Sequence, residues 1–269
     1  MSHFVETAAA IAREAGALLL PYFRRGVQVE YKGEVDIVTE ADRASEGLIV
    51  RRLAEHFPDH AVVAEEGGGC SGKTGYRWFI DPLDGTTNFA HGFPMFCVSM
   101  GLEKDGEMIA GVIYHPVHDE LFAAEKGSGA QLNGQPIRVS AVKRLEESLV
   151  ATGFPSKKRH KNINIHFYHQ ISMRTHGVRR PGAAALDLAY VAAGRLDGFW
   201  EFHLHSWDVA AGKLLVAEAG GRVTDMKGQP HLLDSADIAA SNGVLHPQLL
   251  EAFAEIFAGK FRVKLPEVG

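Results

Sequence analysis

The chain has 269 residues, of which 46% are hydrophobic and 23% are charged, and its formal net charge is −5. This size and composition fit a globular protein with a large core, and they exclude a disordered chain and a fibrous repeat. The acidic balance gives no basic surface for direct nucleic-acid binding. One short basic run, residues 157–161, reads as a solvated loop, with attraction of phosphate as the alternative.

The two cysteines, Cys70 and Cys97, are too few for a disulfide scaffold, although a single bridge between them stays open. Residues 1–20 have an apolar character, but Arg13 and Glu14 interrupt them and no cationic leader precedes them. We therefore expect neither a signal peptide nor a membrane span, and we expect a cytoplasmic protein.

The first part of the chain predicts two helices. Apolar residues at helical spacing predict a first helix that ends near residues 21–26. A second helix is predicted from about residue 41 to residue 57, because Thr39 and Asp42 have the spacing of a capping box. The capping box by itself explains why an aspartate stands at position 42.

Two short apolar strands run directly into acidic residues. Residues 61–64 precede Glu65, and residues 77–80 precede Asp81 and Asp84. Ligands at the ends of adjacent strands can converge on one cation. The alternative is ordinary turn chemistry, since acids beside proline and glycine are common in loops.

The residues after Asp84 predict the start of a helix. Gly85 permits a close backbone approach, and Thr86, Thr87 and Asn88 are candidates for the N-cap. Free N–H groups at such a helix start attract anions. Carboxylates beside an anion-binding helix end suit a divalent cation and a phosphate together.

The remainder of the chain mixes strands and helices. Residues 95–139 predict an antiparallel sheet with hairpins at Asp-Gly and Asn-Gly pairs. The later strands and helices are predicted at residues 148–151 (strand), 162–174 (helix), 183–193 (helix), 196–202 (strand), 206–219 (helix), 222–230 (hairpin), 238–243 (strand) and 246–257 (helix).

Two acids of the second half have simple structural explanations. Glu201 lies between Trp200 and Phe202, so strand alternation makes it an exposed acid on a half-buried strand. Asp208 follows Ser206, a predicted cap, and an acid in the first turn of a helix is favourable without any function.

Together these segments resemble the inositol monophosphatase family, within the superfamily that includes the fructose-1,6-bisphosphatases. WFIDPLDGTTNFAH is similar to the family's first signature and WDVAAGKLLVAEAGG to its second. VDIVTEAD, VVAEE and GAAALDLAYVAAGRLDGFWE also follow in the family's order, so the resemblance covers essentially the whole chain. Two long signatures in order are more specific than any single acid pair.

The resemblance implies an α/β (α+β) fold, a layered α/β/α/β/α sandwich of the sugar-phosphatase kind. Its N-terminal α+β half would span residues 1–140 and its C-terminal α/β half residues 141–269, packed as one unit. A homodimer is the habit of the family.

The resemblance also implies a metal centre for two to three Mg²⁺ ions, with Mn²⁺ as a substitute. Glu65, Asp81 and the carbonyl of Leu83 match the ligands of the first ion. Asp81, Asp84 and Asp208 match those of the second, and Glu65 contributes to a weaker third. Hard oxygen ligands of this kind are what Mg²⁺ prefers.

The reaction implied is hydrolysis by a metal-activated water without a phosphoenzyme. Glu65 and Thr86 would orient the water, and Asp42 would accept the hydroxyl proton of Thr86. Gly85 and Thr86 match the phosphate contacts.

The positions that match contacts to the hydroxyls of the alcohol are Asp84, Ala184, Glu201 and Asp208. Two positions depart from the family pattern: Ala183 replaces a usual Ser or Thr, and Pro181 is unusual. Both bear on the choice of substrate rather than on the metal ligands.

The expected function is Mg²⁺-dependent, lithium-sensitive hydrolysis of a sugar or polyol phosphomonoester, with myo-inositol 1-phosphate as the first expectation. The alternatives within the same chemistry are fructose-1,6-bisphosphate, another sugar phosphate or a nucleotide 3′-phosphate. The alternative of another class is a regulatory binding protein in transcription or RNA processing.

Overall fold

A computed structural model describes residues 1–31, 37–154 and 162–264. The basic run at 157–161 therefore lies outside the described residues. The helices are α1 (His3–Arg25), α2 (Glu40–His56), α3 (Thr86–Ala90), α4 (Asn164–Ser172), α5 (Ala184–Ala192), α6 (Ser206–Glu218) and α7 (His246–Phe257), with one 3₁₀ turn, η1 (Leu145–Glu147). The strands are β1 (Val29–Tyr31), β2 (Ile37–Thr39), β3 (Ala61–Ala64), β4 (Tyr76–Asp84), β5 (Cys97–Lys104), β6 (Glu107–His115), β7 (Glu120–Glu125), β8 (Gly129–Leu132), β9 (Gln135–Ile137), β10 (Leu149–Thr152), β11 (Gly177–Arg179), β12 (Gly198–Phe202), β13 (Arg222–Thr224) and β14 (Asp237–Ser241).

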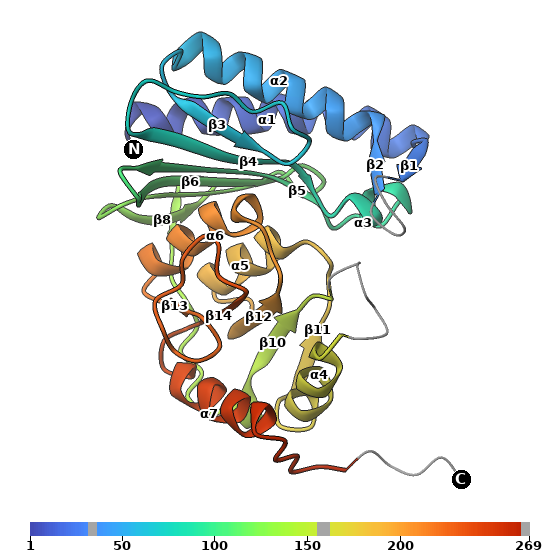
Figure 1. The fold of residues 1–269 in the computed structure, drawn as a ribbon, viewed down its shortest axis with the longest axis vertical. Helices are drawn as coiled ribbons and strands as arrows, with labels where there is room; N and C mark the ends of the chain where they lie inside the picture. Colours follow the sequence, from blue (N-terminus) through green and yellow to red (C-terminus); the bar gives the residue numbers. More distant parts are fainter. Residues whose placement is uncertain (32–36, 155–161, 265–269) are drawn as a thin grey trace.

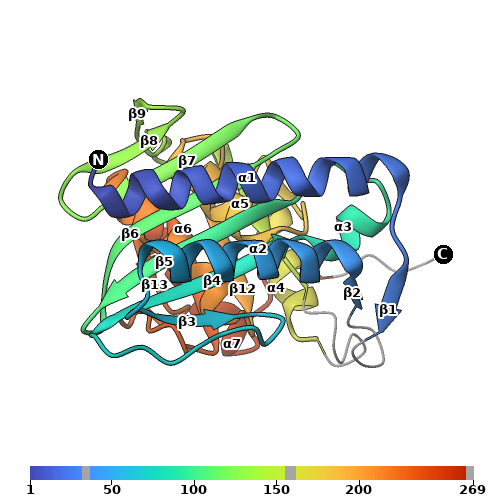
Figure 2. The same cartoon turned by 90° about the horizontal axis from the view of Figure 1, so that it is seen from above.

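These elements form alternating layers of helix and sheet (Figure 1). Helices α1 and α2 cover the outer face of the larger sheet, and Figure 2 shows them side by side above it. Helices α5 and α6 lie between the larger and the smaller sheet, and α4 and α7 cover the far face of the smaller one. The predicted α/β/α/β/α sandwich is confirmed.

The outer helices form where the sequence predicts them. The buried residues of α1, among them Val5, Ala12 and Leu19, recur on one face and pack in the core beneath it. The helix ends at Gly26, whose φ of 80° no helical residue adopts. Among the described residues, no helix combines the length and the apolar character needed to cross a bilayer.

The larger sheet has the order β3-β4-β5-β6-β7-β8-β9 within the described residues. Strand β3 pairs in parallel with β4, and the pairs that follow are antiparallel. The predicted hairpins are confirmed, because Asp105–Gly106 and Asn133–Gly134 all have positive φ. Cys70 and Cys97 are both free thiols, so the bridge left open by the sequence does not form.

The smaller sheet has the order β11-β10-β12-β14-β13 within the described residues. It is covered on both faces, by α5 and α6 on one side and by α4 and α7 on the other (Figure 1). Every residue of β12 is consequently buried. The boundary between halves near residue 140 stays a prediction, since the middle helices pack between both sheets.

The middle layer approaches the larger sheet closely at two paired glycines. Gly101 of β5 and Gly111 of β6 lie opposite one another. A Cβ on Gly101 would lie 2.7 Å from the Cβ of Ala210 and 2.9 Å from the backbone nitrogen of Ala211 in α6. Helix α6 can therefore rest on the sheet only while this position has no side chain.

We expect Gly101→Ala to destabilise the fold by about 1 to 3 kcal/mol, because backbone and a short side chain stand where the new methyl group must fit. Gly47→Ala is the matched control. A Cβ there has no neighbour within 4 Å, and the helix α2 should gain about 0.5 to 1 kcal/mol. Urea unfolding measures both variants. A Gly101→Ala protein as stable as the wild type would contradict this packing.

Candidate active site

Glu65 and Asp81 each come directly after a pair of residues matched between two adjacent parallel strands. Ala64 of β3 pairs with Ile80 of β4, so the next residue along each strand is one of the two acids. Parallel strands place such residues at the same edge of the sheet. The negative charges that act on Asp81 come from Glu65, Asp84 and Asp208, so the four predicted ligand carboxylates share one neighbourhood.

Strand β4 continues through the acidic segment rather than ending at Ile80. Asp81 pairs with Ser99 and Asp84 with Cys97 of β5, and the register shifts between the two aspartates. Such an irregularity re-aims side chains at a sheet edge. Asp81 Oδ1 accepts a hydrogen bond from the Leu83 N–H at 3.0 Å, which is the turn chemistry predicted for this segment.

Asp84 joins the larger sheet to the middle helix layer. Its Oδ2 accepts a hydrogen bond from the N–H of Ala185 at 2.8 Å, and the thiol of Cys97 lies 3.6 Å away. Burial and the charge of Asp208 raise the pKa of Asp84 to about 7. Burial, followed by the charge of Glu65, raises the pKa of Asp81 well above its ordinary value. Carboxylates in such surroundings favour a proton or a cation.

Asp208 reaches this neighbourhood from the first turn of α6, as the sequence predicts. Its Oδ2 accepts a hydrogen bond from the N–H of His205 at 2.6 Å. His205, rather than Ser206, is the N-cap residue, so the predicted cap is wrong by one position. The carboxylate of Asp208 contributes to the capping box, because it accepts the hydrogen bond from the N–H of the N-cap residue.

Helix α3 begins at Thr86, after Gly85. The prediction that Thr86, Thr87 or Asn88 caps this helix is wrong, because Gly85 is the N-cap in a left-handed conformation with φ of 94°. Asn88 instead donates hydrogen bonds to the carbonyls of Met95 at 2.7 Å and Pro181 at 2.8 Å. These bonds fix α3 against the segment before α5.

Asp42 and Thr86 are in contact, as the family resemblance implies. The Thr86 hydroxyl lies 3.0 Å from Asp42 Oδ1 and 3.1 Å from the Leu83 carbonyl oxygen, and its one proton serves one acceptor at a time. Asp42 Oδ2 accepts the N–H of Thr39 at 2.8 Å, which completes the predicted capping box. Both roles considered for Asp42 therefore coexist. Burial raises its pKa, against the hydrogen bonds from Thr39.

Glu201 is 7% exposed, so the prediction of an exposed acid is wrong. Strand alternation assumes one solvated face, and β12 has none. Gly153 makes room for this side chain, since a Cβ there would lie about 2.1 Å from the Glu201 carboxylate. Burial, then the charges of Asp208 and Asp84, raises the pKa of Glu201 well above its ordinary value.

Asp187 is a residue that the sequence reasoning missed. Both of its carboxylate oxygens are buried without a hydrogen-bond partner among the described residues. Burial, followed by the charges of Glu201 and Asp84, raises its pKa well above the ordinary value. The signal was an acid within the otherwise apolar helix α5, where every turn faces the core.

The donor chemistry fits a hard divalent cation. Glu65, Asp81, Asp84 and Asp208 provide carboxylate oxygens and Leu83 a carbonyl oxygen, which are the ligand types of Mg²⁺. Among the described residues, no three His, Cys, Asp or Glu side chains yet direct their donor atoms to one point.

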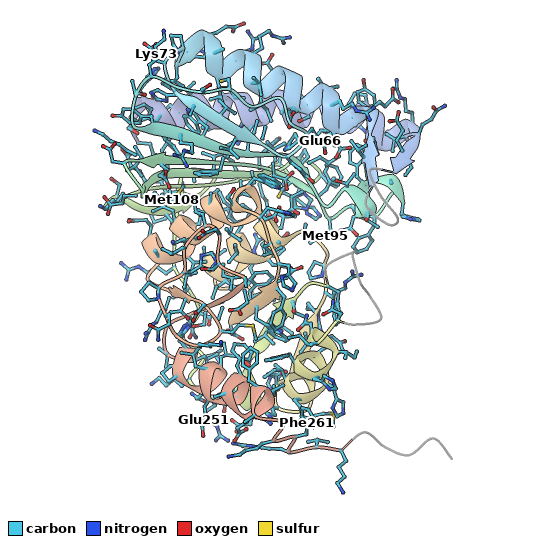
Figure 3. The ribbon with its side chains drawn as sticks, in the orientation of Figure 1. Glu66, Lys73, Met95, Met108, Glu251 and Phe261 are labelled. Atoms are coloured by element: carbon cyan, nitrogen blue, oxygen red, sulfur yellow. The ribbon has the colours of Figure 1, made fainter. Side chains whose placement is uncertain are left out.

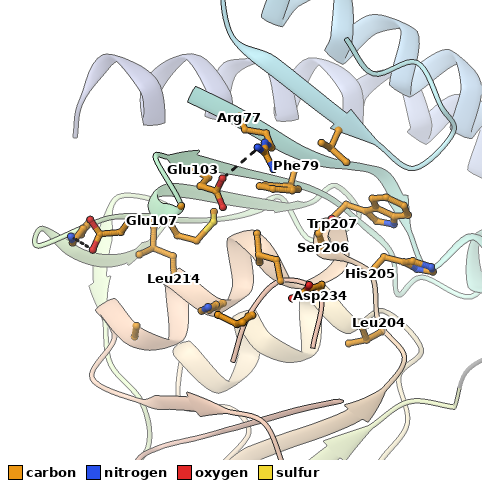
Figure 4. A pocket seen from close by; sticks show the side chains of 18 of the residues that line it. Arg77, Phe79, Glu103, Glu107, Leu204, His205, Ser206, Trp207, Leu214 and Asp234 are labelled. Atoms are coloured by element: carbon orange, nitrogen blue, oxygen red, sulfur yellow. Dashed lines mark ion pairs between the residues drawn. The ribbon is translucent and has the colours of Figure 1, made fainter. Parts of the chain in front are cut away.

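The site lies toward the α3 end of the molecule. Figure 3 shows Glu66 and Met95 toward that end and Lys73 and Met108 toward the other. A cavity of about 1010 Å³ lies along the sheet face near Arg77 and Phe79 (Figure 4). None of the predicted metal ligands lines it. Chemistry rather than volume therefore identifies the candidate site.

Asp84→Asn tests the electrostatics of this site. An unfolded aspartate loses its proton near pH 3.9, whereas folded Asp84 holds one up to about pH 7. Between these values the folded state binds more protons, so the contribution of Asp84 to stability falls as pH rises. With metal ions chelated, we expect Asp84→Asn to raise Tm by several degrees at pH 8, with the difference vanishing near pH 4. Thermal unfolding at both pH values measures it, and a variant no more stable at pH 8 contradicts it.

The comparisons with known proteins identify the family of the chain. A sequence model of the Inositol monophosphatase family matches residues 1–258. An inositol-1-monophosphatase of Mesorhizobium japonicum is 46% identical over 231 residues, which cover 85% of this chain and 86% of that protein. The Nus factor SuhB of Pseudomonas aeruginosa is 46% identical over 250 residues, covering 90% and 92%.

Solved structures show the same fold. The extragenic suppressor protein suhB of Bartonella henselae has a TM-score of 0.89 at 43% identity, covering 94% of this chain and 98% of that one. The IMPase of Thermotoga maritima has a TM-score of 0.89 at 38% identity, covering 96% and 100%. The chain belongs to the inositol monophosphatase family, a family of phosphomonoesterases.

Proposed function

We propose that this protein hydrolyses a sugar or polyol phosphomonoester in a Mg²⁺-dependent reaction, with myo-inositol 1-phosphate as the leading substrate. The observation that carries the proposal is the cluster of carboxylates around Asp81 and Asp84. The pKa values of these two aspartates are raised by burial and by the charges of neighbouring carboxylates. Family membership supports the same chemistry. Charges confined in this way need a counter-charge, and a divalent cation supplies it.

Two cations, and a third that binds more weakly, are assigned to the cluster. Glu65, Asp81 and the Leu83 carbonyl would hold the first, and Asp81, Asp84 and Asp208 the second, with Glu65 contributing to a weaker third. When bound, the cations neutralise phosphate charge and make a water acidic enough to attack at neutral pH. Mn²⁺ is expected to substitute, since it accepts the same oxygen ligands.

The residues around the cations orient the reactants. If the Leu83 carbonyl held a cation, Asp42, whose Oδ1 lies 3.0 Å from the Thr86 hydroxyl, would be the remaining acceptor for that hydroxyl. The lone pairs of the Thr86 oxygen would accept a hydrogen bond from the attacking water. If that water then gave a proton to Thr86, the hydroxyl proton of Thr86 would pass to Asp42. Glu65 would hold the other side of that water. The backbone of Gly85 and Thr86 would contact the phosphate.

The alcohol part of the substrate would lie between the two sheets. Glu201 and Asp208 present carboxylate oxygens that accept hydrogen bonds from vicinal hydroxyls. Ala184 and Asp84 would complete this side. Ala183 is buried and has no hydroxyl, so one polar contact usual in the family is missing and substrate preference is the property most open to change.

A homodimer, inhibition by Li⁺ and a cytoplasmic location are further expectations from the family resemblance. They concern properties that the fold alone does not determine.

A substrate panel tests the activity. We expect hydrolysis of inositol 1-phosphate to exceed that of fructose-1,6-bisphosphate and of 3′-phosphoadenosine 5′-phosphate by about tenfold or more, because Glu201 suits a polyol. EDTA should abolish the activity and Mg²⁺ restore it. Released phosphate measures both. Faster hydrolysis of the nucleotide would overturn the substrate assignment, and full activity in EDTA would overturn the metal assignment.

A second candidate function is regulatory binding in transcription or RNA processing. The observation that favours it is the 46% identity to a relative named Nus factor SuhB. Asp84→Asn separates the two functions, because it removes a proposed metal ligand while keeping the side-chain shape. If cells carrying only this variant lose phosphatase activity and keep the growth of the wild type, the regulatory function is the one that matters for growth.

A further inference from the structure

Helix α2 presents three buried polar side chains to the active-site segments. Asp42, Ser45 and Glu46 lie three and four residues apart, so they share one face of the helix. Asp42 contacts Thr86, and the Ser45 hydroxyl donates a hydrogen bond to the Pro82 carbonyl at 2.8 Å. Glu46 reaches a third segment, the one that follows strand β3.

Glu46 binds this segment through both carboxylate oxygens. Its Oε2 accepts a hydrogen bond from the N–H of Glu66 at 2.7 Å, and its Oε1 accepts one from the N–H of Gly68 at 2.7 Å. The side chain is only 5% exposed. Hydrogen bonds from backbone N–H groups to a shielded carboxylate are among the stronger ones in proteins.

The glycines after Glu66 are required by this contact. Gly67 has a φ of 89°, a conformation that other residues rarely adopt. A Cβ on Gly68 would lie 2.7 Å from Glu46 Oε1. Glu46 therefore holds the backbone at Glu66 and Gly68, immediately after Glu65.

We infer that Glu46 is a positioning residue for Glu65. The inference rests on the proposed function, in which Glu65 holds a cation and orients the attacking water. Glu46 itself is not among the residues assigned to the cations or the substrate, and both of its carboxylate oxygens accept backbone N–H groups. It fixes the backbone from Glu65 to Gly68. The segment is therefore already ordered when the Glu65 carboxylate is needed beside Asp81.

Removing one acceptor should loosen this segment while the rest of the site stays in place. In Glu46→Gln, the amide retains one acceptor oxygen and turns a donor toward one of the two N–H groups. We expect the half-saturating Mg²⁺ concentration to rise about 10- to 100-fold, the range seen when the supports of metal ligands are removed. The KM of the substrate at saturating Mg²⁺ should change less than threefold.

Helix α6 offers a matched control. Glu218 accepts hydrogen bonds from the N–H groups of Gly127 and Gly129, each at 2.8 Å, in the turn between β7 and β8. The chemistry is that of Glu46, again with two N–H groups two residues apart. Glu218 lies at the opposite end of α6 from Asp208. Glu218→Gln should therefore cost stability without changing the Mg²⁺ requirement.

Gly68→Ala disrupts the same contact from the side of the loop. It provides a second test if Glu46→Gln folds poorly. Its new methyl group displaces the Glu46 carboxylate, so it should raise the Mg²⁺ requirement as Glu46→Gln does. The double variant should be no worse than the poorer single variant, because both changes break one contact.

The experiment compares the wild type with these four variants. Electron paramagnetic resonance titration with Mn²⁺ gives a binding constant that needs no turnover, and initial rates against Mg²⁺ give the kinetic requirement. The inference predicts weaker Mn²⁺ binding, about tenfold or more, in Glu46→Gln and Gly68→Ala, and a change below twofold in Glu218→Gln.

The outcomes separate the two levels of the account. In one outcome the wild type binds Mn²⁺, and Glu46→Gln and Gly68→Ala bind it with the same affinity as Glu218→Gln. Glu46 then has only a structural role and the inference is wrong. If the wild type itself binds no Mn²⁺ and hydrolyses no phosphomonoester, the proposed function fails and the inference falls with it.

Discussion

The candidate site depends on several carboxylates that the fold holds close to one another, with Asp81 and Asp84 buried among them. Asp81 and Asp84 lie in a strand that is buried from Trp78 onward, and Asp208 and Glu65 add negative charge to the same place. Such an arrangement opposes folding unless protons or cations neutralise it. The fold tolerates this cost because three elements hold the cluster: β4 carries two acids, α6 a third, and β3 leads into the fourth.

The surrounding layers supply the support. Helix α5 donates the Ala185 N–H to Asp84 from one side, and the buried polar face of α2 reaches the active-site segments from the other. Each support comes from an element far from the carboxylates in the sequence. The site therefore exists only in the folded chain, where α2 and α5 contact the segments that carry the acids.

Much of this was predictable from the sequence, because the signals are local or shared with a family. The strand before Asp81 and the capping box of Asp42 are read within a few residues. The burial of Glu201 was not predictable, since it follows from two helix layers packing on both faces of β12. The burial of Asp187 beside the charges of Glu201 and Asp84, and the contacts of Glu46 with Glu66 and Gly68, were also not predictable. They join segments that are distant in the chain, for which a single sequence holds no direct signal.

The most direct measurement is the anomalous diffraction of a crystal grown with Mn²⁺ and phosphate. The account predicts at least two strong Mn²⁺ peaks bounded by the oxygens of Glu65, Asp81, Asp84 and Asp208, with phosphate between them and the N-terminus of α3. Peaks elsewhere, for example in the cavity beside Arg77, or no peak among these carboxylates at saturating Mn²⁺, would contradict it.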